Sequence, residues 1–167
     1  MPILDKKSYF FTKSRVVTFA VLSAFIIGFD QLTKHWARTS LDRNPRFLGD
    51  TNIGFSLAFN SGSAFSLFED STIFITLIAT LVVGILIFLV FRTDRMPLSY
   101  AYMLIAIGAV GNIIDRITQA PYGGHGFVTD FIKIGWWPTF NIADSAISIG
   151  AVLLVISSFA KERNSDE

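Results

Sequence analysis

The chain has 167 residues, of which 51% are apolar, and it contains 17 Phe and no Cys. This composition favours a membrane protein over a soluble one. A net charge of +1 leaves no broad basic face for nucleic acid, and the lack of Cys excludes disulfides, thiolate metal sites and cysteine nucleophiles.

The N-terminal segment is polar and basic up to Arg15, and an apolar run follows it. No cleavage site of the small-x-small type follows the run, so we expect an uncleaved transmembrane helix over about residues 16–36. Asp30 and Lys34 lie four residues apart and therefore share one face of this helix. They form either an interfacial ion pair with Lys34 extending outward, or part of a site.

Residues 37–71 are too polar to span a membrane and form the first outer loop. Large apolar residues alternate with small or polar ones over residues 53–60, which predicts a strand with one apolar face. This strand is expected in a short sheet on the membrane surface. Residues 60–64 predict a turn, in which Asn60 is either a turn former or a site residue, and the apolar pattern resumes at 64–68.

Two more transmembrane helices follow, over residues 72–91 and 98–117. Each has about the 20 residues that cross a ~30 Å hydrocarbon core at 1.5 Å per residue. A polar cluster ends the second of these helices. Asn112 and Arg116, at i and i+4, face the same way, with Asp115 beside them. The cluster faces the bundle interior, or else Asp115 and Arg116 anchor the helix at the lipid headgroups.

Residues 118–139 form the second outer loop. Alternation of side chains near its end predicts another strand, with Asp130 on the same side as Val128 and Ile132. A carboxylate on the apolar side of a strand breaks the local pattern, so Asp130 is a candidate functional group.

The last span covers residues 140–160 and holds a single charge, Asp144. An Asp at the centre of a transmembrane helix costs roughly 2.5–3.5 kcal/mol on insertion scales, so a carboxylate here needs a partner or a task. Ala146 and Gly150, four residues apart, predict a face of small residues for close helix packing.

Four spans place both chain ends on one side of the membrane. That side carries eight Lys and Arg residues against six on the other, and it includes the basic N-terminus and a short loop with two Arg, which predicts cytoplasmic ends. The unusual polar residues then converge near the outer face: Asp30, Asn60, Asn112, Arg116, Asp130, Asn141 and Asp144.

This convergence limits the available chemistry. Neither His35 nor His125 lies in a motif that would pair it with a Ser or place it in a zinc site. A Ser–Lys dyad using Lys34 stays open, although no Ser stands out as its partner. Paired carboxylates remain, with Asp130 and Asp144 as candidates. Two such groups at close range share one proton, so the ionised one can take a proton from water while the neutral one donates to a carbonyl oxygen.

Five blocks rich in polar residues follow one another along the chain: Asp30–Lys34, Asn60–Ser66, Gly111–Arg116, Val128–Phe131 and Phe140–Ala146. In this order they resemble the bacterial lipoprotein signal peptidases, also called signal peptidase II. The resemblance covers about residues 20–155 and implies that Asp130 and Asp144 are the catalytic dyad. It implies substrate binding or dyad orientation for Asn60, Gly62, Asn112, Arg116 and Asn141. It implies structural support for Asp30, Lys34 and Asp115.

The resemblance also implies the activity. The family consists of membrane aspartic endopeptidases that remove the signal peptide from a diacylglyceryl-modified prolipoprotein, just before the lipidated cysteine. It implies a place in the bacterial plasma (inner) membrane, with the site near the outer (periplasmic) face and both termini in the cytoplasm. The expected partners are this substrate and membrane lipids. No cofactor, metal or nucleic acid is expected, and the chain is expected to act as a monomer.

The expected architecture is a single membrane-embedded domain over residues 1–167, mainly α. It is a four-transmembrane-helix bundle with a small β-sheet cradle and a loop at the outer membrane surface. The alternative is a small proton-coupled transporter, because intramembrane carboxylates also serve as proton relays. A carrier should show internal repeats with helices broken at mid-depth, and the sequence shows no repeat. A purely structural membrane protein would leave the carboxylate of Asp130 unexplained.

Overall fold

The computed structural model describes residues 13–41, 44–62, 71–119 and 126–163 of the chain. The described elements are α1 (Lys13–Ser40), β1 (Arg46–Phe47), β2 (Ile53–Asn60), α2 (Ser71–Arg92), α3 (Met96–Thr118), β3 (Val128–Ile134) and α4 (Ile142–Arg163). The apolar pattern predicted at 64–68 lies outside the described residues. The predicted fold class, a mainly helical membrane protein with a small sheet, is confirmed.

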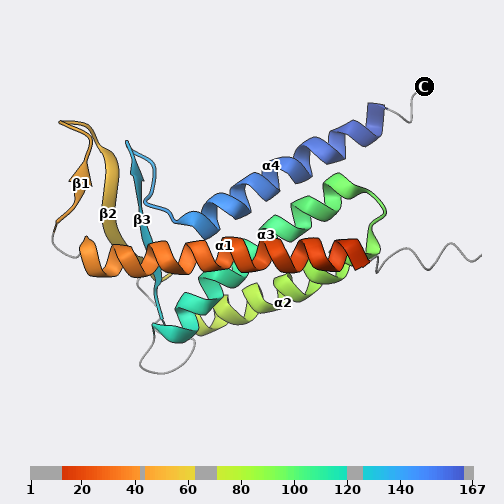
Figure 1. Cartoon of the computed structure of the whole chain (residues 1–167), viewed down its shortest axis with the longest axis horizontal. Coiled ribbons are helices and arrows are strands. Elements are labelled where there is room, and N and C mark those ends of the chain that lie inside the picture. The colour runs from red at the N-terminus through yellow and green to blue at the C-terminus, as the bar shows by residue number, and fades with distance from the viewer. Residues whose placement is uncertain (1–12, 42–43, 63–70, 120–125, 164–167) are drawn as a thin grey trace, which may run out of the picture.

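Figure 1 shows the sheet at one end of the helices and the α2–α3 connection at the other end. Helices α1 and α3 end, and α4 begins, at the sheet end. All four helices are long and apolar enough to cross a membrane. They also expose large apolar side chains, among them Phe25, Leu81 and Phe159, as contact with lipid requires. The chain is therefore a multi-pass membrane protein.

Helix α3 lies at the centre of the bundle, since it contacts α1, α2 and α4. Its approach to α4 is close enough to require glycine. A Cβ on Gly108 would lie 2.4 Å from the carbonyl oxygen of Ala143, and a Cβ on Gly150 would lie 2.9 Å from that of Ala101. The small-residue face predicted at Gly150 therefore packs on α3, and backbone contact fixes how near the two helices lie.

Two arginines join the helices at the end remote from the sheet. Arg15 of α1 donates to the carbonyl oxygen of Thr93 in the α2–α3 connection, and Arg95 donates to that of Ser157 in α4. Helix α3 begins just after Arg95, with a Pro in its first turn, where a missing N–H breaks no helical hydrogen bond. Both α1 and α4 are thus attached to the α2–α3 connection.

The three strands form one antiparallel sheet in the order β1-β2-β3. Three steps along β2, from Phe55 to Ala58, match two steps along β3, from Ile132 to Asp130, so the pairing contains a bulge. Beyond the bulge, Ala58 pairs with Asp130. Asn60 lies two residues further on, on the same face as Ala58, so its side chain is a diagonal neighbour of Asp130.

An aromatic cluster joins the sheet to α1. The ring of Trp36 meets the rings of Phe55 and Phe131 edge-on, with centroids 5.4 and 6.2 Å apart. Ala37 and Leu41 are buried with Phe131 in the same cluster. Aromatic pairs of this kind contribute about 0.5–1.5 kcal/mol each beyond the burial of their surface. The cluster fixes the last turns of α1 against the strands and so positions the polar residues one turn earlier.

Candidate active site

The first turn of α4 is built around Asn141, the residue before the helix. The backbone N–H of Asp144 donates to Asn141 Oδ1 at 2.9 Å, and the backbone N–H of Asn141 donates to Asp144 Oδ2 at 3.1 Å. This is a reciprocal capping box, which satisfies two backbone donors that a helix start leaves free. It holds the half-buried Asp144 carboxylate at the positive end of the helix dipole.

Asp130 lies on β3 and is 2% exposed. Its Oδ1 accepts from Asn141 Nδ2 at 2.6 Å, and its Oδ2 accepts from Asn60 Nδ2 at 3.1 Å. Burial raises the pKa of the Asp130 carboxyl to about 6, and repulsion from the Asp144 carboxylate adds to the rise. The two amide donors and the positive charge of Lys34 oppose it. Asp130 and Asp144 therefore interact electrostatically and share Asn141 as a hydrogen-bond partner.

Asn112 of α3 connects Asp144 of α4 with Lys34 of α1. Its Nδ2 donates to Asp144 Oδ1 at 2.8 Å. Its Oδ1 accepts from Asn141 Nδ2 at 3.2 Å and from Lys34 Nζ at 3.0 Å. Five elements (α1, β2, α3, β3 and the start of α4) thus contribute to one continuous network.

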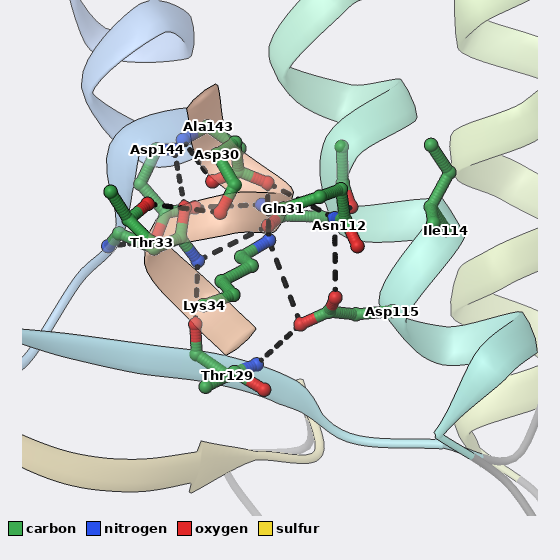
Figure 2. Close-up of polar contacts among 12 residues, drawn as sticks. Asp30, Gln31, Thr33, Lys34, Asn112, Ile114, Asp115, Thr129, Ala143 and Asp144 are labelled. Atoms are coloured by element: carbon green, nitrogen blue, oxygen red, sulfur yellow. Dashed lines mark hydrogen bonds and ion pairs between the residues drawn. The ribbon is translucent and has the colours of Figure 1, made fainter. Parts of the chain in front are cut away.

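A cluster of buried charges lies next to Asn112, which contacts Asp144 (Figure 2). Asp30, Lys34 and Asp115 are all 0% exposed. Lys34 Nζ lies 2.8 Å from Asp30 Oδ2 and 3.6 Å from Asp115 Oδ2, and the backbone N–H of Thr129 donates to Asp115 Oδ2 at 2.8 Å. The outward-pointing alternative for Lys34 and the headgroup-anchor alternative for Asp115 are therefore wrong.

Asp30 connects α1 to the start of α4. Its Oδ1 accepts the backbone N–H of Ala143 at 2.9 Å, which satisfies another free donor in the first turn of α4. The carboxylate reaches this position beside Gly111, where a Cβ would lie 2.9 Å from Asp30 Oδ2. Three residues that look unrelated in sequence thus meet at the beginning of one helix.

Arg116 and Gly62 meet on another side of the network. Arg116 is 9% exposed, and its Nε has no hydrogen-bond partner within the described part of the chain. Its charge interacts with Asp144 and Asp130. Gly62 has a φ of +75°, its N–H donates to Asn60 Oδ1 at 2.8 Å, and a Cβ there would lie 2.9 Å from Arg116 Nη2. Glycine therefore provides both the backbone conformation and the space.

A cavity of about 300 Å³ lies beside Asp144. The residues that line it come from the end of β2, the segment before α4 and the first two turns of α4: Asn60, Trp137, Pro138, Thr139, Phe140, Asp144 and Ser148. Within the described ranges no group of three or more His, Asp or Glu could hold a metal ion. The cavity thus borders one carboxylate of the network, that of Asp144, and one amide, that of Asn60.

Three network residues were not among the predicted site residues. Gln31 Nε2 donates to the carbonyl oxygen of Gly111 at 3.1 Å, and Arg38 Nη1 donates to Thr129 Oγ1 at 2.9 Å. The signal for Arg38 is its position four residues after Lys34, on the same helix face. Thr129 acts largely through its backbone N–H and carbonyl oxygen, which residue types in a sequence do not reveal. Gln31 acts through its side-chain amide, which also lies 3.3 Å from carboxylate oxygens of Asp30 and Asp115.

Comparisons with known proteins identify the family of the chain. A family model described as "Signal peptidase (SPase) II" matches residues 22–160. The "Lipoprotein signal peptidase" of Mycobacterium leprae (strain Br4923) is 34% identical over 163 residues, covering 95% of this chain and 79% of the relative. That of Hydrogenovibrio crunogenus (strain DSM 25203 / XCL-2) is 41% identical over 159 residues, covering 87% of each.

A solved chain described as a bacterial membrane enzyme, determined by the in meso method at 2.3 Å resolution, shares the fold. Its TM-score is 0.75 at 27% identity, covering 89% of this chain and 92% of that one. A second such chain, at 1.9 Å resolution, has a TM-score of 0.75 at 28% identity. Together with the match of the family model over most of the sequence, these likenesses mean that the chain belongs to the signal peptidase II family.

Proposed function

We propose that this chain is an aspartic endopeptidase that removes the signal peptide from prolipoproteins, cutting just before a cysteine that carries diacylglycerol. Family membership supports the peptidase activity and the prolipoprotein substrate, and gives the transporter alternative no support. The aspartic mechanism rests on one observation. Asn141 donates through its side chain to Asp130 and through its backbone to Asp144, so two carboxylates are held around one residue.

In the proposed mechanism the reactive form of the enzyme is the one in which Asp130 carries the proton that the pair shares. Asp130 is almost fully buried and its pKa is raised to about 6, whereas Asp144 is half-buried at the start of α4. Asp144 takes a proton from the water that attacks the scissile carbonyl carbon, and Asp130 donates its proton to the carbonyl oxygen. The tetrahedral intermediate then collapses as Asp130 recovers its proton and Asp144 passes its new proton to the leaving nitrogen.

Three amides and one guanidinium assist the dyad in this proposal. Asn112 and Asn141 orient the carboxylates, and Asn60 donates to Asp130 from the end of β2. Arg116 has the binding or orienting role that its motif position implies, and its positive charge acts on both Asp144 and Asp130. Gly62 leaves the room that the guanidinium needs.

We place the dyad near the outer face of the inner membrane, with both termini in the cytoplasm. Arg15, Arg92 and Arg95 lie at the ends of helices remote from the sheet, and Lys and Arg favour the cytoplasmic side. The diacylglycerol can then stay among membrane lipids while water reaches the peptide bond. We also propose a monomer, because one chain supplies both carboxylates and their donors.

The proposal is tested with purified protein in detergent micelles and a diacylglyceryl-modified precursor, with cleavage followed by gel mobility. Asp130→Asn and Asp144→Asn should each lower kcat by at least about 10³-fold, because losing one member of a catalytic unit removes most of its effect. Asp94→Asn is the matched control, since Asp94 is exposed in the α2–α3 connection, and it should leave kcat unchanged. Normal turnover by either dyad variant would remove that residue from the chemistry.

The same assay tests the dependence on lipid. The wild-type protein should cleave an unlipidated precursor of the same sequence much more slowly than the lipidated one. Equal rates for the two precursors would contradict recognition of the diacylglycerol, while leaving the aspartic mechanism intact.

A further inference from the structure

The buried ammonium of Lys34 occupies a central position in the network (Figure 2). It contacts Asp30 Oδ2 at 2.8 Å and Asn112 Oδ1 at 3.0 Å, and the side chain is 0% exposed. The contact with Asp30 neutralises a buried carboxylate. The contact with Asn112 has a separate consequence, because Asn112 also contacts Asp144.

We propose that Lys34 is a positioning residue for the proposed peptidase reaction: it fixes the orientation of the Asn112 amide so that Nδ2 points at the Asp144 carboxylate. The proposal rests on the function proposed above and adds a residue that acts on the dyad from α1, through α3.

The reason lies in which groups can donate and which can accept. An ammonium has three donors and no acceptor, whereas an amide presents an acceptor on one side and donors on the other. With Asn112 Oδ1 facing Lys34, Nδ2 faces Asp144 and donates to it at 2.8 Å. A rotated amide would set its NH₂ group against the ammonium and its oxygen against the carboxylate. Both contacts would be repulsive.

Asn141 also donates to Asn112 Oδ1, at 3.2 Å, and its own amide is fixed by Asp130 and by the backbone N–H of Asp144. Lys34 adds a charged donor at the shorter distance of 3.0 Å, and hydrogen bonds from charged groups are roughly twice as strong as neutral ones. The ammonium is also held in place, because Asp30 Oδ2 accepts from it while Asp30 Oδ1 accepts from the backbone of Ala143. The orientation of Asn112 is thereby tied to the start of α4, where Asp144 lies.

The test compares two variants that differ only in whether residue 34 can donate. Removing Lys34 alone would leave Asp30 as an unpaired buried charge, so both variants carry Asp30→Asn, whose Oδ1 can still accept from Ala143. The first adds Lys34→Met and the second adds Lys34→Gln, a side chain of similar length with an amide donor. Each is made with Asn112 intact and again with Asn112→Ala, and kcat and KM are measured on the diacylglyceryl-modified precursor.

With Asn112 intact, we expect the Gln variant to retain a kcat at least about tenfold above that of the Met variant, with similar KM, because misplacing a catalytic group can lower the rate about 100-fold. With Asn112→Ala the two should agree within about a factor of two, since Lys34 then has no amide to orient. The proposal would be overturned by equal kcat values of the Gln and Met variants with Asn112 intact. It would also be overturned by the same ratio of their kcat values in both backgrounds, or by an effect on KM alone.

Two controls keep these outcomes separate from other failures. Wild-type protein that does not cleave the precursor would count against the proposed function, not against the role of Lys34. Thermal unfolding in the same micelles shows whether each variant is folded. If the Met variant is not folded, the variant that carries both Asp30→Asn and Lys34→Gln is compared with wild type. A kcat within about tenfold of wild type then supports positioning by a donor, and a larger loss overturns it.

Discussion

Asp130 is 2% exposed, and the groups that donate to its carboxyl are the neutral amides of Asn60 and Asn141. Neutral amides replace part of the hydration that a carboxylate loses on burial, but they bring no positive charge. The pKa of Asp130 consequently rises to about 6 despite two good hydrogen bonds. At this one residue the fold favours a neutral carboxyl at a pH where an ordinary Asp is ionised.

This raised pKa predicts how stability depends on pH. The native Asp130 binds a proton up to about pH 6, whereas the unfolded one releases it near 3.8, so the native state loses stability as the pH rises between these values. Two pKa units correspond to roughly 3 kcal/mol. Asp130→Asn cannot titrate, so the stability of the variant relative to wild type should increase from pH 4 to pH 7.

The measurement is thermal unfolding of both proteins in the same detergent at each pH. Asp94→Asn, at an exposed position, is the control and should follow wild type throughout. Parallel pH dependence for Asp130→Asn and wild type would mean that burial of this carboxyl does not destabilise the native state.

At the scale of elements, the start of α4 is the part on which the candidate site depends. Its free backbone donors are satisfied by Asn141 from the preceding segment and by Asp30 from α1. Its position relative to α3 is set by the contact of Gly108 with the carbonyl oxygen of Ala143. The same turn carries Asp144, so a change in helix packing also moves a carboxylate of the proposed dyad.

Gly108→Ala tests this dependence. The added Cβ would lie 2.4 Å from the carbonyl oxygen of Ala143, so α4 must shift. Overpacking of this kind costs about 1–3 kcal/mol. We expect a lower unfolding temperature together with a lower kcat, measured by thermal unfolding and by precursor cleavage.

Gly84→Ala on α2 is the matched control for that experiment. A Cβ at Gly84 meets nothing within 4 Å, so the variant should keep its activity and gain up to about 1 kcal/mol from better helix propensity. If the two variants had the same stability and activity, the close approach of α3 and α4 would not position the site.

For the whole molecule, the sequence contains enough to predict the class of fold. Each helix corresponds to a long apolar run, and the alternation at 53–60 corresponds to β2. These features are local, because the spacing of apolar residues within a segment distinguishes a helix from a strand, and a transmembrane helix also satisfies its backbone hydrogen bonds internally. The family motifs add the polar positions, which the structure places in one network.

What the sequence could not decide was the direction of the charged side chains. Asp30 and Lys34 have the same spacing whether they face lipid headgroups or the bundle interior. Only the arrival of Asn112 and Asp115 from α3 determines that Lys34 points inward. The sequence also could not place Thr129 in the network, because its contact with Asp115 is made by its backbone N–H. The direction of these side chains therefore depends on contacts between elements that are distant in sequence, which residue patterns do not show.

Asn141 binds Asp130 through its side-chain amide and Asp144 through its backbone amide. A carboxylate accepts a hydrogen bond more strongly when ionised than when neutral. In the proposed reaction, each proton transfer would strengthen one of these bonds and weaken the other. Because both bonds belong to the residue just before α4, the protonation state of the pair would in this reaction act directly on the start of a membrane-spanning helix.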